Sequence, residues 1–256
     1  MFAYATLSPA KRFNDPDKLD KHPTTAPAFA AEAAVIAQQM SRCDRNALME
    51  LMRISEKIAQ LNVTRFHAMA ESQHSPTAAA LLYFAGDAYK ALSPASLSPK
   101  ELTHSQECLG LLSGLYGLLR PLDAIQAYRL EMSTNTSAIL GQNLYGFWSK
   151  MVTKQLDKMI QQAQARYHLN LASAEYAQVI DCEQLSVPTL EIVFARRKDS
   201  KYAVTGVVAK RMRGLMARAL IEKRLNSLDD LRSYHAGKHS FAAEFSSDEK
   251  YVFIEE

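Results

Sequence analysis

The chain has 256 residues, 48% of them hydrophobic and 22% charged, and a formal net charge of +3 at pH 7. These values are ordinary for a globular protein and exclude the disordered and fibrous classes. Its apolar runs are far shorter than the roughly 20 residues that cross a bilayer. Its first residues lack the pattern of a secretory signal, and its three cysteines are too scattered for a disulfide framework. We therefore predict one domain over residues 1–256, a cytoplasmic location and no membrane partner.

Hydrophobic periodicity and runs of β-branched residues predict a mixed α/β (α+β) fold in which helices surround short strands. Strands are expected at 2–7, 169–172, 187–195 and 202–208. Helices are expected at 30–40, 48–61, 101–112, 144–164 and 210–225. The Ser-Pro pairs at 8–9, 93–94 and 98–99 are typical of helix starts, because proline at the first helical position loses no needed hydrogen bond.

A turn with glycine at both ends, Gly114–Gly117, lies between two segments that are expected to be helical. One interpretation is a plain helix–turn–helix corner. The other is a turn whose backbone N–H groups donate to a phosphate near a helix N-terminus. Arg120 and Arg129 follow soon after and would add positive charge to the second arrangement.

The segment 210–225 is the best-defined amphipathic helix. Its apolar face consists of Val208, Met212, Leu215, Met216 and Ala219. Its basic residues lie elsewhere on the helix, with Lys210, Arg213 and Arg224 opposite the apolar face and Arg211 and Arg218 on its flank. The helix is thus expected to be anchored by one face and to present guanidinium groups on the others.

The charge is distributed unevenly along the chain. Residues 193–224 contain ten Lys and Arg residues and two acids, so this segment carries a formal charge of +8 and the remainder −5. Such asymmetry has two interpretations, a solvated helix face or a surface for a phosphate-bearing partner.

Ser8 and Lys11 have the Ser-x-x-Lys spacing of serine acyl-enzymes. The companion motifs of those enzymes are absent, so a helix cap is the favoured interpretation. The glycine-rich signatures of nucleotide-binding folds are absent as well. We therefore nominate no catalytic residue and expect no cofactor.

His235 and His239 have the i, i+4 spacing of metal ligands, and Glu244 is a third candidate ligand. Gly237 lies between the two histidines, which favours a surface turn over a metal-binding helix. Direct iron binding by this set is therefore the weakest hypothesis, and we expect no metal site.

The sequence LSGLYGLLRPLD at 112–123, followed by YRLEM at 128–132, closely resembles the bacterial YaaA family of peroxide stress response proteins. Further segments resemble that family in the same order along the chain, at 7–11, 51–57, 65–67, 144–148, 170–176 and 213–218.

The resemblance implies a stress protein that limits unincorporated iron, and so iron-dependent damage by hydrogen peroxide. It also implies DNA binding through a basic cleft and a helix-hairpin-helix-like element, which we expect at Ser113–Pro121, without an established reaction. The partner is then the phosphate backbone of duplex or structured DNA. The residues carried onto this DNA-binding site are Lys11, Arg53, Lys57, Gly114, Gly117, Arg120, Arg129, Lys210, Arg211, Arg213 and Arg218.

The alternative hypothesis is an enzyme of unknown reaction that holds an anionic small molecule in a basic pocket, since arginine forks suit carboxylate and phosphate groups. The residues of that pocket would be Lys11, Arg120, Arg129, Glu131 and Glu175. Two positions depart from the family pattern: Ala85 stands where a lysine is expected, and Ala174 where an acid is expected. An active site that depends on those two groups would be altered in this chain.

Overall fold

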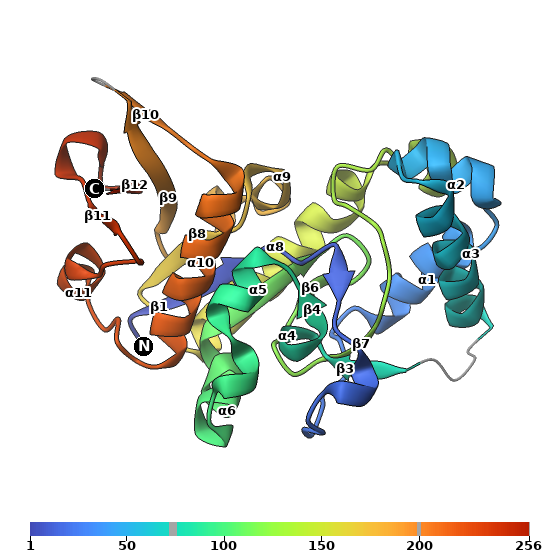
Figure 1. Cartoon of the computed structure of the whole chain (residues 1–256), viewed down its shortest axis with the longest axis horizontal. Coiled ribbons are helices and arrows are strands. Elements are labelled where there is room, and N and C mark those ends of the chain that lie inside the picture. The colour runs from blue at the N-terminus through green and yellow to red at the C-terminus, as the bar shows by residue number, and fades with distance from the viewer. Residues whose placement is uncertain (72–75, 199–200, 256) are drawn as a thin grey trace.

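The computed structural model describes residues 1–71, 76–198 and 201–255, and its centre is a mainly parallel sheet (Figure 1). The strand order in this sheet is β11–β12–β9–β8–β1–β5–β6, with β10 paired to β9. Strands β1, β5, β8, β9 and β12 run parallel, whereas β6, β10 and β11 are antiparallel to their neighbours. The bounds are β1 Ala3–Leu7, β5 Leu109–Ser113, β6 Gly117–Leu119, β8 Tyr167–Leu171, β9 Thr189–Lys198, β10 Lys201–Ala203, β11 His239–Phe241 and β12 Lys250–Glu255.

Helices surround this sheet, which confirms the mixed α/β class. The longer ones are α1 Ala30–Met40, α2 Arg45–Met52, α3 Glu56–Ala70, α6 Pro99–Cys108, α8 Leu144–Gln162 and α10 Gly206–Ile221. The shorter ones are α4 Ala80–Tyr83, α5 Asp87–Leu92, α7 Ser137–Leu140, α9 Ala174–Ala177 and α11 Leu228–Ser233. Two further strand pairs are small, β2 Arg12–Phe13 with β4 Phe84–Ala85 and β3 Thr77–Ala79 with β7 Ala124–Gln126.

The helices fall into distinct groups. Helix α8 contacts β1 and β6, while α10 contacts β1 and β9 on one side and α5 and α6 on the other. Helices α1, α2 and α3 pack on one another and lie to the right of the sheet in Figure 1. Within the described ranges, no helix has the length and apolar character needed to cross a membrane.

Several sequence-based boundaries are wrong. The helix expected at 48–61 is two helices, because Arg53 adopts the left-handed conformation with φ 51° and ends α2. The helix expected at 101–112 ends at Cys108, and the following leucine-rich run is β5, which pairs with β1 and is buried. The strand expected at 202–208 ends at Ala203, where its pairing with β9 stops, and α10 begins at Gly206. The Ser8-Pro9 pair begins no helix, because the chain enters β2 at Arg12.

The helix-hairpin-helix expected at 113–121 is a β-hairpin between β5 and β6. Its backbone is buried, and the N–H groups of Leu115 and Tyr116 donate to Ser113 Oγ at 3.2 and 2.8 Å. These donors are therefore not available to a phosphate.

Packing explains both glycines of this hairpin. A Cβ on Gly114 would lie 2.4 Å from Leu130 O, and one on Gly117, whose φ is +66°, would lie 2.7 Å from the Trp148 ring. The Trp148 indole N–H donates to Gly114 O at 3.0 Å. The motif that suggested a phosphate cradle is thus a core contact between the hairpin and α8.

Helix α10 crosses α5 at unusually close range. A Cβ on Gly214 would lie 2.0 Å from the carbonyl oxygen of Ala88, so glycine is required where the two backbones meet. Because α10 is covered by the sheet on one side and by α5 on the other, most of its second half is buried.

Three neighbouring strands are linked by a buried histidine. His168 of β8 has no exposed surface; its Nε2 lies 2.9 Å from Thr6 Oγ1 of β1, and its Nδ1 lies 3.0 Å from Thr189 Oγ1 of β9. Burial lowers the pKa of His168 to about 3, so the ring is neutral in the folded protein.

The neutral His168 makes folding pH-dependent. An unfolded histidine has a pKa of about 6.5, so between pH 6.5 and 3 the unfolded chain binds a proton that the folded chain does not. The contribution of His168 to the free energy of unfolding is complete above pH 6.5 and falls by about 1.4 kcal/mol per pH unit below it. Urea unfolding at pH 7.5, 6 and 5 should show this loss, and His168→Gln should flatten it. Parallel curves for the two proteins would contradict the assignment.

Alanine substitutions at the two glycines of α10 should change the free energy of unfolding in opposite directions. Gly214→Ala forces the backbones apart and should lower the free energy of unfolding by about 2–3 kcal/mol. Gly206→Ala is the matched control, because nothing lies within 4 Å of its Cβ position, and it should stabilise α10 by about 0.5–1 kcal/mol. Thermal and urea unfolding of both variants measure the difference.

Candidate functional site: a cavity between the ends of β1 and β8

Strands β1 and β8 are parallel neighbours in the sheet, and the connections that leave them lead to opposite sides of the pair. After β1 the chain crosses to β5 on one side, and after β8 it crosses to β9 on the other. A crevice outside the carboxyl ends of two such strands is the usual ligand site of open α/β sheets. A cavity of about 250 Å³ lies there.

Four segments line this cavity. They are residues 7–12 after β1, residues 171–176 after β8 through Leu171, Ser173, Glu175 and Tyr176, residues 85–89 at the start of α5, and Lys210 and Arg213 of α10. Four of the lining side chains are cationic and two are acidic.

Two serines join the strand ends at the cavity. The Ser173 N–H donates to Ser8 Oγ at 2.8 Å, and the two hydroxyl oxygens lie 3.3 Å apart. Tyr89 of α5 donates its hydroxyl to Ser8 O at 3.0 Å. These contacts hold β1, β8 and α5 together and place two hydroxyl groups at the cavity wall.

A chain of ion pairs stands behind Lys11. Its Nζ lies 2.6 Å from Glu131 Oε2, and Arg129 Nη2 lies 2.5 Å from Glu131 Oε1. Burial alone would raise the pKa of Glu131, but hydrogen bonds from Lys11 and Arg129 outweigh it and hold that pKa below its usual range. Glu175 Oε1 accepts hydrogen bonds from the Ser133 N–H and hydroxyl at 3.2 and 2.9 Å. The structure thus brings together Lys11, Arg129, Glu131 and Glu175 of the predicted pocket.

Arg213 lies in the cavity wall. The expectation that its side chain faces solvent, opposite the apolar face of the helix, is wrong. Arg213 is half-buried because α10 is covered on both sides. Burial lowers the pKa of Arg213, an effect that the nearby Glu191 opposes. Its buried Nε has no hydrogen-bond partner among the described residues.

Arg120 lies outside this cavity. Its guanidinium donates to Asp123 Oδ1 at 3.2 Å through Nε and at 3.0 Å through Nη2, and to Ala26 O at 3.2 Å. Asp123 is buried, and its other oxygen accepts the Arg120 backbone N–H at 2.8 Å. Arg120 is therefore the counter-charge of a buried carboxylate.

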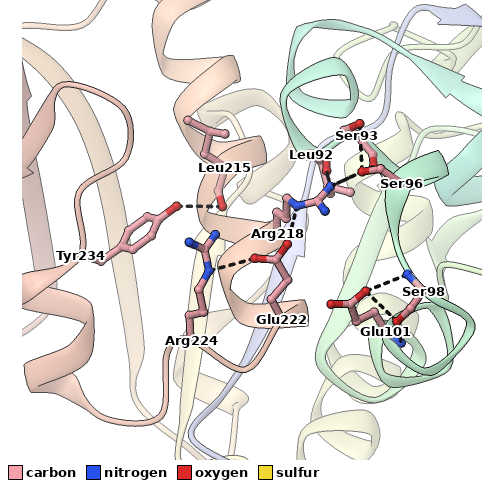
Figure 2. A network of polar contacts seen from close by, with 10 residues as sticks. All are labelled: Leu92, Ser93, Ser96, Ser98, Glu101, Leu215, Arg218, Glu222, Arg224 and Tyr234. Carbon is pink, nitrogen blue, oxygen red and sulfur yellow. Dashed lines mark hydrogen bonds and ion pairs between the residues drawn. The ribbon is translucent and has the colours of Figure 1, made fainter.

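Arg218 is held in a structural network that Figure 2 shows. Its Nη1 donates to Leu92 O at 2.7 Å, Ser93 O at 3.0 Å and Ser96 Oγ at 2.8 Å, and its Nε donates to Glu222 at 2.6 Å. Leu92 and Ser93 end α5, so the guanidinium satisfies carbonyl groups that a helix end leaves open. This arginine fastens α10 to α5.

The Arg218 network should be a large source of stability. Arg218→Ala leaves the α5 carbonyls and Glu222 without their donor and should lower the free energy of unfolding by about 2–3 kcal/mol, because hydrogen bonds to charged groups are strong. Arg211→Ala, an exposed position on the same helix, should change it by less than about 0.5 kcal/mol. Urea unfolding of both variants tests this, and equal midpoints would contradict the role of Arg218.

The remaining predicted DNA contacts are at the surface. Arg53 lies between α2 and α3 and Lys57 in the first turn of α3, and both are exposed. Lys210 and Arg211 are exposed near the start of α10, where Lys210 also reaches the cavity. The eleven predicted residues are therefore divided among the cavity, the surface and structural contacts.

The candidate iron ligands do not form a cluster. His239 is buried with its ring 5.9 Å from that of Phe194, and Glu244 forms an ion pair with Arg197 at 2.5 Å. His235 Nδ1 lies 3.0 Å from Ser240 Oγ. In the part of the chain that the structure describes, no three His, Cys, Asp or Glu side chains are grouped as metal ligands.

One departure from the family pattern lines the cavity, and the other lies next to lining residues in the sequence. Ala85 lines it and pairs with Arg12 in the β2–β4 ladder. Ala174 begins α9, between Ser173 and Glu175, which line it. A lysine at position 85 would therefore have added a positive charge to the cavity wall.

Sequence reasoning missed Ser173, Asp87 and Tyr89. One signal could have linked Ser173 to Ser8, because each follows directly on a predicted strand, at 2–7 and 169–172. If those strands were recognised as parallel neighbours, their carboxyl ends would be expected to share a site. Asp87 and Tyr89 belong to a six-residue helix that the sequence pattern did not indicate.

The sheet and the cavity define a mixed α/β protein with a cation-lined crevice at a topological switch point. The chain matches the family described as peroxide stress protein YaaA over residues 4–245 and belongs to that family. It is 39% identical over 249 residues to a UPF0246 protein of Dinoroseobacter shibae, covering 97% of this chain and 93% of the relative. It is 36% identical over 250 residues to a UPF0246 protein of Legionella pneumophila, covering 97% of each chain. The predicted family is confirmed, and a general role in oxidative stress follows from it.

Proposed function

We propose that this peroxide stress protein binds duplex DNA through the phosphate backbone and limits iron-dependent peroxide damage there. The observation that carries the proposal is the helix pair α2–α3, which joins two helices through the three residues Arg53–Ser55. This pair has the helix–turn–helix arrangement that the sequence suggested for another segment.

The turn leaves donors open at the start of α3. Arg53 is in the left-handed conformation, and its N–H donates to Met49 O, which ends α2. Ser55 is the N-cap of the 15-residue α3, but its side chain makes no capping hydrogen bond. The N–H groups of the first turn and the positive end of the helix dipole are therefore available to an anion such as a DNA phosphate.

The charge of the helix pair supports the same partner. Arg53 and Lys57 are exposed, and neither has an ion-pair or hydrogen-bond partner among the described residues. The acidic Glu56 beside them is already paired with Arg45. Two free cations next to an open helix N-terminus suit backbone contacts, which position a protein on DNA without reading its sequence.

A second group of exposed cations lies on the β9–β10 ribbon and the start of α10. Lys198, Lys201 and Arg211 are exposed and have no partner among the described residues. Two-stranded ribbons contact duplex DNA in other proteins. In this chain the ribbon would add phosphate contacts distant in sequence from those of α2–α3.

Backbone binding links DNA to iron by simple electrostatics. Lysine and arginine side chains that neutralise phosphates release the cations condensed on the duplex. Ferrous iron held by phosphates would be released in the same way, so peroxide would react with iron farther from the DNA.

The proposal predicts steep salt dependence of duplex binding. Each phosphate contact adds about 0.9 to the slope of log K against log salt concentration, so Arg53→Ala/Lys57→Ala should lower the slope by about 1–2. Shuffled duplexes should bind alike. Fluorescence anisotropy of a labelled duplex over a salt series measures both.

The matched control is Lys154→Ala/Lys158→Ala on α8, which removes the same charge at the same spacing from exposed positions elsewhere. Its slope should stay within experimental error of the parent slope. An equal fall in both double variants would assign the effect to net charge and contradict a site at α2–α3. Absence of duplex binding at low salt would overturn the proposed function.

A further inference from the structure

We propose that the cavity between β1 and β8 binds the phosphate group of a small phosphate monoester, with Arg213 as its main ligand. This site lies at the carboxyl ends of the strands and is independent of the DNA contacts proposed for α2–α3. The inference stands on the charge of the cavity, the unpaired guanidinium and the size of the space.

The charges around the cavity favour a dianion. Its walls contain Lys11, Arg12, Lys210 and Arg213 against Asp87 and Glu175. The ion pair of Arg129 with Glu131 behind Lys11 adds no net charge, and Glu191 near Arg213 is itself paired with Lys250 at 3.5 Å. The excess of two positive charges matches a phosphate monoester, which carries a charge of about −1.5 to −2 at pH 7.

Arg213 has the donor capacity that such a group requires. Its buried Nε lacks a partner among the described residues, whereas Arg218, five positions along the same helix, donates to Leu92, Ser93, Ser96 and Glu222. The fold thus satisfies the structural arginine of α10 and leaves the cavity arginine with an open donor. A guanidinium binds two phosphate oxygens at once through its planar fork.

The other walls add shorter-range recognition. Ser8 and Ser173 supply hydroxyl groups, and Lys210 is exposed on α10, from where its ammonium can contact the same phosphate. Ala88, Tyr89 and Tyr176 supply apolar and aromatic surface for the rest of the molecule. The space of about 250 Å³ is below the roughly 300–1,000 Å³ of typical ligand pockets, which fits a phosphate with one sugar-sized group.

Isothermal titration calorimetry of the full chain at low salt tests the proposal with ribose 5-phosphate and glycerol 3-phosphate as probes. Ribose and glycerol are the matched ligands without phosphate. We expect saturable binding of at least one phosphorylated probe, no binding of its unphosphorylated counterpart, and inorganic phosphate as a weaker competitor.

Two variants and one control assign the site. Arg213→Met should weaken binding by at least roughly 30-fold, because a buried charged contact is lost, and Lys210→Met should weaken it less. Arg166→Met is the matched control, since Arg166 is exposed at the amino end of β8, the opposite end from the cavity. Its affinity should equal that of the parent protein.

The folded state of the variants is measured separately by thermal unfolding without ligand. Arg213→Met should unfold at the same temperature as the parent or higher, because a half-buried side chain whose buried Nε has no partner among the described residues is replaced by an apolar one. Lys210 is exposed, so Lys210→Met is expected to fold and tests the site if Arg213→Met does not fold.

Failure of both phosphorylated probes to bind, or equal losses of affinity in Arg166→Met, would overturn the proposal. Duplex binding is expected to persist in Arg213→Met, so failure of this site and failure of DNA binding are distinguishable.

Discussion

The close contact between α10 and α5 positions Arg213 at the cavity and Arg218 in its hydrogen-bond network. Gly214 has no side chain where the backbone of Ala88 passes, and this lets the two helices meet at a distance that no other residue allows. Arg218 then reaches the carbonyl groups at the end of α5, and Arg213, one residue before the glycine, lies in the cavity wall. One steric constraint therefore sets the surroundings of two arginines that belong to the same short sequence motif.

The cations of the basic segment 193–224 have different surroundings in the folded protein. Arg218 forms a largely buried ion pair with Glu222, whereas Arg196 and Arg197 form ion pairs with Glu255 and Glu244 at the surface. Lys198, Lys201 and Arg211 face solvent, and Lys210 and Arg213 reach the cavity. The net charge of +8 that suggested a single polyanion surface is thus shared among stability, surface and cavity. Two of these acids, Glu244 and Glu255, lie outside the segment, so the pairing of Arg196 and Arg197 depends on how the chain folds.

The sequence predicted helices well where one face of the helix is buried and the other is exposed to solvent. Helices α1 and α8 sustain a helical period over 11 and 19 residues, and both were expected within a few residues of their bounds. The run 109–113 is buried completely, so it shows no period, and its leucines are compatible with helix or strand. Its pairing with β1 makes it a strand, and the glycine turn that follows becomes a β-hairpin.

For the candidate site too, some features follow from the sequence and others only from the tertiary structure. The sequence by itself determined the mixed α/β class, the peroxide stress family and the inventory of cations, because composition, periodicity and motifs are local properties of the chain. Only the tertiary structure decided which cations are free. Arg218 contacts residues more than 120 positions away, and Lys11 pairs with Glu131 across a similar interval. Coulomb and hydrogen-bond energies act over a few ångströms in space, so the role of each charged side chain is fixed by neighbours that chain order does not reveal.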